Sequence, residues 1–340
     1  MNLPNYEFLS APLWLITTLH LLTLSLHLVA MNFLLGGVIV VVQGAMRGRV
    51  QQPALARWTR LLPTAMAATV TLGVAPLLFL QLVYPRQAYA AAIVSGWFWL
   101  LIIAAVIVVY TAIYVAAVRS EKSGKIHLPA LLVALIGLLY VSIAYGSIFA
   151  MAERPDLIHQ LYTKVQSGFV WNPATGDYLL RWLHMVLGAV TVGGFCVAAL
   201  NRDDAEMYQT GKSFFVFGMA LGAVVGLAYL VSLAPYLVAL MHTPAIWALM
   251  AAIVFALGAL HFFFAKKLPA SGAMLFVSLF GMVYVRHTVR LVKLAGQFDP
   301  GHWRVAPQWG PFLLFVVCFV AALATMTYML RLFFAHDTAT

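Results

Sequence analysis

Nine long apolar runs dominate this sequence. A helix that crosses the hydrocarbon core of a bilayer needs about 20 mostly apolar residues, and nine segments of the 340-residue chain meet that requirement. The sequence therefore predicts an all-α, polytopic membrane helical bundle of about nine transmembrane helices. The expected spans are residues 11–45, 61–84, 91–118, 128–151, 179–200, 213–239, 244–265, 270–291 and 310–334.

The apolar runs follow one another too closely for a separate soluble module. The longest loops, 152–178 and 292–309, are too short to fold on their own, so we expect a single integral membrane domain over residues 1–340. The apolar start at Pro12 follows no basic segment and no small-residue cleavage site. We therefore expect a retained first helix and not a signal peptide.

Composition excludes several classes of protein. Hydrophobic residues make up 64% of the chain and charged residues 9%, whereas a soluble domain carries about 25% charged residues. The net charge of +10 comes from 20 Lys and Arg against 10 Asp and Glu, mostly in short loops, which is typical of membrane topology and not of a nucleic-acid binder. Cys196 and Cys318 lie far apart in apolar runs without a CxxCH motif. This pattern excludes a covalently attached c-type haem.

The basic residues of the loops indicate an orientation. With the N-terminus outside, twelve Lys and Arg fall on the inner side and eight on the outer side, as the positive-inside rule favours. We therefore expect an integral membrane protein with its N-terminus outside and its C-terminus inside. Four of the eight outer residues lie within 286–304, a concentration that topology alone does not require.

Histidines enter the predicted spans, whereas all ten Asp and Glu map to loops or span ends. The absence of acids within the spans argues against a proton-coupled transporter and a carboxylate-rich di-metal site. His20 and His27 share one face of the first span, about 10 Å apart along the axis, and His184, His261 and His287 lie on later spans. Imidazole is a common metal ligand and an axial ligand of haem iron. A hydrogen-bonded packing role is the simpler interpretation for each histidine alone.

Two segments resemble subunit I of the cytochrome bd quinol oxidases. TTLHLLTLSLHLVAMNFLLGG at 17–37 is similar to that family's first helix, and WNPATGDYLLRWLHMVLGAVTVGG at 171–194 is similar to its low-spin haem segment. The resemblance implies that His20 matches the ligand of the high-spin haem, with His27 as an addition. It also implies that His184 is an axial ligand of a haem b and that Arg181 neutralises a haem propionate.

The resemblance further implies a second ligand for that haem b. In the family this ligand is a methionine near the outer end of the seventh helix. Met250 lies about two turns into the corresponding span here, at a depth compatible with His184. Met241 and Met282 are alternatives for this role, as is His287 if the iron has two histidine ligands. Met250 as an ordinary packing residue also stays open.

The sequence also departs from the family. The third span, SGWFWLLIIAAVIVVYTAIY, lacks the acids of the oxygen site, and the eighth reads MVYVRHTVRLVKL without the acidic haem ligand. Only residues 240–243 stand where the family has its long quinol-binding loop. The resemblance therefore supports the scaffold and the haem b site but not oxygen reduction.

A basic segment is predicted at the outer face. A belt of interfacial Trp and snorkelling Arg would explain it. Alternatively, Arg286 and Arg290 bind haem propionates, the remaining residues dock an acidic c-type cytochrome, and His287 ligates a second haem, paired with His20 or alone. The segment consists of Arg286, His287, Arg290, Lys293, His302 and Arg304, with Trp303 and Trp309.

Together these features predict an electron-transfer subunit with one or two haems b. Such a subunit of an oxidoreductase complex would pass electrons between a quinol pool, or a membrane partner subunit, and an outer c-type cytochrome, without reducing oxygen. Three alternatives remain from the sequence. They are a haem-free membrane anchor of a redox complex, a transporter for a small solute that uses the outer arginines, and a quinone-binding subunit without haem.

Overall fold

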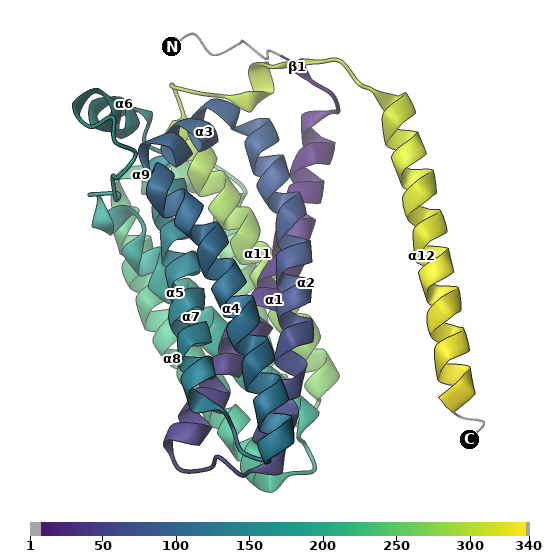
Figure 1. The fold of residues 1–340 in the computed structure, drawn as a ribbon. Coiled ribbons are helices and arrows are strands. Elements are labelled where there is room, and N and C mark those ends of the chain that lie inside the picture. Colours follow the sequence, from purple (N-terminus) through teal and green to yellow (C-terminus); the bar gives the residue numbers. More distant parts are fainter. Residues whose placement is uncertain (1–7, 338–340) are drawn as a thin grey trace. The chain divides into compact units, whose positions relative to one another are not determined.

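The computed structural model describes residues 8–337 of the chain, and helices account for most of them (Figure 1). Within this part, nine helices are long and apolar enough to cross a membrane, which confirms the predicted fold class of a multi-pass, all-α membrane protein. They are α1 (Leu13–Met46), α2 (Pro53–Val83), α4 (Gly96–Ser123), α5 (Leu128–Met151), α7 (Leu179–Leu200), α8 (Ala205–Ser232), α10 (Ala245–Phe264), α11 (Leu268–Leu294) and α12 (Trp309–Asp337).

Three short helices occur where the sequence predicted loops or span ends. They are α3 (Pro85–Val94), α6 (Pro155–Lys164) and α9 (Ala234–Met241). The predicted span 213–239 was too long at its end, because α8 ends at Ser232 and α9 begins two residues later. Pro235 lies in the first turn of α9, where its missing N–H costs no hydrogen bond, whereas inside a continuous helix it would break one.

The described residues divide into two units, and each is considered by itself. Thr18–Asp299 form the larger unit, which contains all but the first turn or so of α1 and all of α2 to α11. The smaller unit combines residues before Thr18 with residues from Pro300 onward. In it, β1 (Phe8–Leu9) pairs in parallel with β2 (Arg304–Val305), and α12 follows. His302, Trp303, Arg304 and Trp309 of the predicted basic segment belong to the smaller unit, and the rest belong to the larger one.

The larger unit repeats one order of elements. Two long helices, a short helix and two more long helices make up α1–α5, and α7–α11 follow the same order (Figure 1). The motif Leu-His-x-Val, separated by six residues from a Gly-Gly pair, occurs in α1 at 26–37 and again in α7 at 183–194. Gly36 and Gly193 are the first glycines of the two pairs, and they meet each other where α1 and α7 cross. The two halves are therefore related by an internal repeat with its contact point at this glycine pair.

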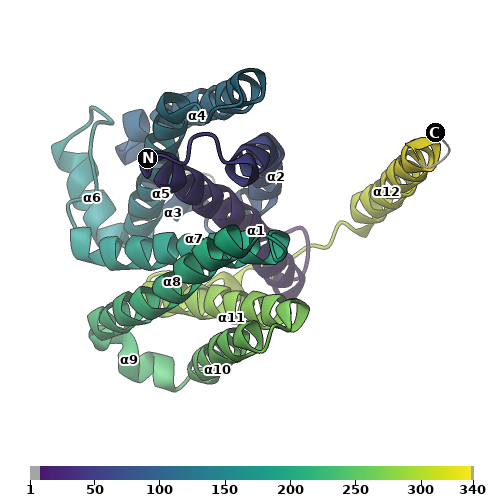
Figure 2. The same cartoon turned by 90° about the horizontal axis from the view of Figure 1, so that it is seen from below.

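The crossing has no room for a side chain. A Cβ added at Gly193 would lie 2.5 Å from the Gly36 Cα, and a Cβ added at Gly36 would lie 2.7 Å from the Gly193 Cα. Small residues let membrane helices approach this closely, so that backbone contacts replace side-chain packing. The view along the bundle shows α1 beside α7, with α8 on the other side of α7 (Figure 2).

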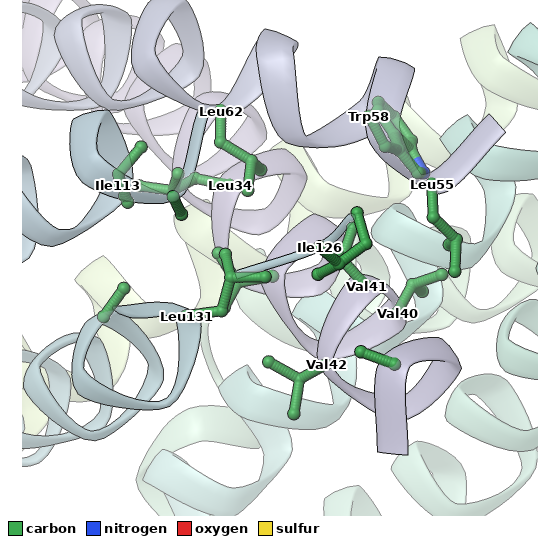
Figure 3. Close-up of a cluster of buried hydrophobic side chains, with 14 of the residues drawn as sticks. Leu34, Val40, Val41, Val42, Leu55, Trp58, Leu62, Ile113, Ile126 and Leu131 are labelled. Atoms are coloured by element: carbon green, nitrogen blue, oxygen red, sulfur yellow. The ribbon is translucent and has the colours of Figure 1, made fainter. Parts of the chain in front are cut away.

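Apolar side chains fill the core of the first half. Leu34 of α1, Leu62 of α2, Ile113 of α4 and Leu131 of α5 are fully buried and point toward one another (Figure 3). Large apolar side chains elsewhere stay exposed on the helix surfaces, such as Ile107 on α4, which is 61% exposed. Exposed apolar faces of this kind suit hydrocarbon, because a helix satisfies most of its backbone polar groups with its own hydrogen bonds.

Candidate functional site

Charged side chains from three helices converge at the end of the bundle where α3, α6 and α9 lie, called the α3 end below. Glu153 follows α5 by two residues, and only 1% of its side chain is exposed. Arg286 forms a direct ion pair with it, and Arg290 Nε lies 3.5 Å from the same carboxylate oxygen. Arg181 Nη1 and Lys293 Nζ lie 3.8 and 3.7 Å from the other oxygen. We call these five residues the Glu153 cluster.

The helix period explains how α11 supplies three of the four cations. Arg286, Arg290 and Lys293 are four and three residues apart, so they project from one face of α11. Arg181 comes from the first turn of α7, where it also donates a hydrogen bond to the Gly146 carbonyl of α5. The cluster therefore ties the end of α5 to the start of α7 and to the last two turns of α11.

The cluster carries an excess of positive charge. Four cations against one carboxylate leave a formal charge of +3, in a site that excludes water from Glu153, Arg181 and Lys293. Arg181 Nη1 and Arg286 Nη1 are buried without a hydrogen-bond partner among the described residues. Buried cations are costly unless they are paired and hydrogen-bonded, so this arrangement suits an additional anionic group.

Electrostatics hold Glu153 in its ionised form. Burial alone would raise the pKa of the carboxyl group, but Arg286, Arg181, Arg290 and Lys293 outweigh this effect and lower the pKa to about 2. Opposite charges within a few ångströms favour the charged form of a carboxyl group. Glu153 is therefore a permanent anion at any physiological pH.

Aromatic rings border the cluster. The Arg290 guanidinium lies 5.4 Å from the ring centroid of Tyr84, which follows α2, and Lys293 Nζ lies 5.7 Å from that of Tyr236 in α9. Cations at these distances are attracted by the ring faces. Burial raises the pKa of the Tyr84 hydroxyl, although the nearby Arg290 opposes the shift. The rings stabilise two of the surplus cations without adding a negative charge.

Two histidines face each other next to the cluster. The rings of His20 on α1 and His287 on α11 have their centroids 6.5 Å apart, at an angle of 55°. Their Nδ1 atoms are buried without a hydrogen-bond partner in the described chain. A metal bound about 2 Å from a nitrogen of each ring would separate the centroids by about 6 Å. The spacing of the two rings therefore fits one metal centre with two histidine ligands.

The charged cluster and the histidine pair share α11. Arg286 and Arg290 flank His287 in the sequence, and Arg290 lies close enough to interact electrostatically with both imidazole rings. His20 also interacts with the Pro76 carbonyl of α2. His287 therefore lies within two helical turns of the three cations that α11 supplies.

His27 and His184 have equivalent neighbours in the two halves of the larger unit. His27 Nδ1 donates to the Thr69 carbonyl of α2 at 3.0 Å, and His184 Nδ1 donates to the Gly222 carbonyl of α8 at 3.0 Å. Four residues further along each partner helix, a glycine faces the ring. A Cβ added at Gly73 would lie 2.8 Å from His27 Cε1. A Cβ added at Gly226 would lie 2.9 Å from His184 Cε1. An Nδ1–H bonded to a carbonyl leaves Nε2 as the basic, metal-binding nitrogen.

The structure brings some of the predicted site residues together. His20 and His27 both face α2, next to Pro76 and Thr69, which confirms that they share one face of α1. The structure also places the predicted pair His20 and His287 next to each other. Their ligation of a metal stays a prediction.

The structure does not bring Met250 to an enclosed position. Its side chain is 54% exposed on α10, whose main neighbour is α11, whereas His184 packs against α8. Met241 is similarly exposed, and His261 is exposed in the last turn of α10. The pairing of Met250 with His184 stays a prediction.

Glu153 is the site residue that the sequence did not single out. It was placed correctly at the end of a span, but its burial and its four cationic neighbours were not predicted. The short helices α3 and α6 contact each other and the end of α5, and this packing helps to bury the carboxylate. The concentration of basic residues within 286–304 was the available signal, because buried cations need a counter-ion.

Comparisons with protein-family models, with curated proteins and with solved structures found no match to this chain. The site geometry and the resemblance of the two histidine segments are therefore the basis for the function proposed next.

Proposed function

We propose that this chain is a haem b-containing electron-transfer subunit of the bacterial inner membrane, resembling subunit I of the cytochrome bd quinol oxidases. The observation that carries the proposal is the His20–His287 pair, whose ring spacing fits an iron with two histidine ligands. Haem would supply a one-electron carrier, and the protein would supply its ligands, burial and electrostatic environment.

The Glu153 cluster supports this assignment. A haem carries two propionate carboxylates. Arg181 and Arg286 each have a buried guanidinium nitrogen without a hydrogen-bond partner among the described residues, and Arg286 directly precedes His287. Charge-assisted bonds from arginine to carboxylate are among the stronger hydrogen bonds in proteins. Two propionates would reduce the formal charge of the cluster from +3 to +1, so the donor set fits the group.

His184 would hold a second haem b at the α7–α8 pair. Its carbonyl-bonded Nδ1 and the glycine against its ring support a ligand role. Met250 is the proposed second ligand in that site, and His27 is the corresponding candidate in the first half. One or two haems per chain follow from this arrangement.

The proposed partners are a donor in the membrane and an acceptor outside it. The donor is a quinol pool or a membrane partner subunit, and the acceptor is a c-type cytochrome at the α3 end. Oxygen reduction is not proposed, because residues 96–120 of α4 carry no acid that could deliver protons.

The first test is a dithionite-reduced minus oxidised visible spectrum of the purified protein, with a pyridine haemochrome count per chain. We expect low-spin b bands and one or two haems per chain. His287→Ala is expected to lower the count by one, because it removes one of two facing ligands. His261→Ala, which changes an exposed histidine on α10, is the matched control and is expected to keep the full count.

The outcomes separate the proposal from its alternatives. A chain that folds, keeps its native partners and shows no haem would contradict the proposal and favour a haem-free anchor or a solute transporter. A His287→Ala protein with full haem content and an unchanged spectrum would show that His287 is not a ligand.

Gly226→Ala tests the second site. The added Cβ would lie 2.9 Å from His184 Cε1 and 3.0 Å from Nδ1, so the ring must move and its bond to the Gly222 carbonyl weakens. We expect loss of the haem bound by His184, with the His20–His287 haem retained. Gly222→Ala is the control on the same helix, since its added Cβ would make an ordinary contact with Leu187 at 3.7 Å. An unchanged haem count in both variants would argue against His184 as a ligand.

A further inference from the structure

The Glu153 carboxylate is connected to the proposed haem site through α11. It pairs with Arg286, which immediately precedes His287, and with Arg290, one turn further along the same helix. Both ion pairs join the segment that follows α5 to the part of α11 that carries His287, which meets His20. Glu153 thereby holds the segment of α11 that presents His287, without touching either histidine.

Glu153 is also the only negative charge in the described cluster. Without it, four cations would lie around the same point, and the formal charge would change from +3 to +4. The carboxylate is almost fully buried, and solvent and salt screen buried charges much less than exposed ones. The histidine pair interacts with the cluster through Arg290, which acts on both rings.

From this geometry we infer that Glu153 is a positioning and charge-balancing residue that keeps the reduction potential of the His20–His287 haem low. The inference rests on the proposed function. Reduction of the iron adds one electron and so removes one positive charge from the site. The positive charge of the cluster favours the reduced form and so raises the reduction potential. The negative charge of Glu153 counteracts this effect and lowers the potential.

A redox titration followed by the visible spectrum tests this role. Glu153→Gln removes the charge but keeps the size of the side chain. We expect the reduced form to be favoured at least tenfold, which is an upward shift of about 59 mV for a one-electron couple. Arg290→Gln is expected to shift the potential downward, because it removes one positive charge from the cluster.

The double variant Glu153→Gln/Arg290→Gln removes one negative and one positive charge, so it keeps the net charge of the unchanged cluster and is expected to return the potential close to that of the unchanged protein. This variant and Arg290→Gln keep the inference testable if Glu153→Gln does not fold. Glu153→Asp, which retains the anion, is expected to shift the potential in the same direction as Glu153→Gln but by less.

Glu206→Gln is the matched control. Glu206 pairs with Arg49 at the opposite end of the bundle, with Arg49 Nη1 2.8 Å from its carboxylate. Removing this charge is expected to leave the potential unchanged. A merely structural role for Glu153 would change stability without giving opposite shifts for Glu153→Gln and Arg290→Gln.

The results distinguish failure of the inference from failure of the proposed function. An unchanged chain without haem contradicts the proposed function. A haem-loaded chain in which Glu153→Gln leaves the potential unchanged or lowers it overturns the inference alone. Equal shifts in Glu206→Gln and Glu153→Gln would also overturn it, because the effect would then not depend on the cluster.

Discussion

Gly193→Ala is expected to lower the free energy of unfolding by about 3 kcal/mol, the upper end of the usual cost of overpacking. The new Cβ would lie 2.5 Å from the Gly36 Cα, where backbone and not a flexible side chain stands in its way. The α1 and α7 helices must then separate along their crossing, and both halves of the repeat lose contacts. We expect a lower thermal midpoint in detergent and a broader size-exclusion profile.

Gly188→Ala is the control for this substitution. Gly188 lies on α7, five residues before Gly193, and a Cβ added there meets no heavy atom of the described chain within 4 Å. Alanine inside a helix is more stable than glycine by about 0.5–1 kcal/mol, so this variant is expected to be as stable as the unchanged protein or slightly more stable. Equal stability of the two variants would show that α1 and α7 do not cross at the glycine pair.

Acidification is expected to remove about 3 kcal/mol of stability as Glu153 becomes protonated, since each pKa unit corresponds to about 1.4 kcal/mol. The pKa of its carboxyl group is lowered from 4.5 to about 2 in the folded protein, despite burial, because four cations surround it. A group with a lowered folded-state pKa stabilises the fold fully above its unfolded pKa. This contribution is therefore complete above pH 4.5 and is lost as the pH falls from 4.5 through about 2.

Thermal or denaturant unfolding in detergent at pH values above, within and below that window measures this effect. Glu153→Gln is expected to be less stable at neutral pH and to lose this part of the acid dependence, because its side chain cannot titrate. Glu206→Gln, which changes a largely exposed carboxylate, is expected to keep it. If the unchanged protein and Glu153→Gln lose stability in parallel on acidification, Glu153 is not the titrating group.

The spans could be predicted from the sequence because bilayer thickness sets the length of an apolar run. The segments 128–151 and 179–200 were predicted with the bounds that α5 and α7 have, and the other spans differ from their helices by one to eight residues at each end. α8 ended early for a local reason, the proline at the start of α9. The predicted start of α2 was too late, because Arg57 and Arg60 make this part of the sequence polar enough to resemble a loop. In the structure the helix begins at Pro53, and both arginines lie in its first turns.

The site was only partly predictable, because its parts come from helices far apart in the sequence. The shared face of His20 and His27 follows from helical spacing within one span. The convergence of Arg181 with Arg286 on Glu153 depends on how α5, α7 and α11 pack, which no local pattern encodes.

The internal repeat was missed for a similar reason. The two copies at 26–37 and 183–194 share only a leucine, a histidine, a valine and two glycines. Most of the other positions face apolar surroundings, where many residues are interchangeable. Only the structure shows that the shared residues make equivalent contacts in the two halves.

The contact of Gly36 with Gly193 is also the point about which α1 would pivot relative to α7. Sixteen residues separate His20 from Gly36, which is about 24 Å of helix. A rocking motion of α1 by about 3° around the crossing would therefore displace His20 by about 1 Å relative to α11. A displacement of that size exceeds the roughly 0.2 Å within which metal–ligand distances are held. The close contact of Gly36 with Gly193 thus helps to fix the distance between the His20 and His287 rings, although the glycines lie several helical turns away from them.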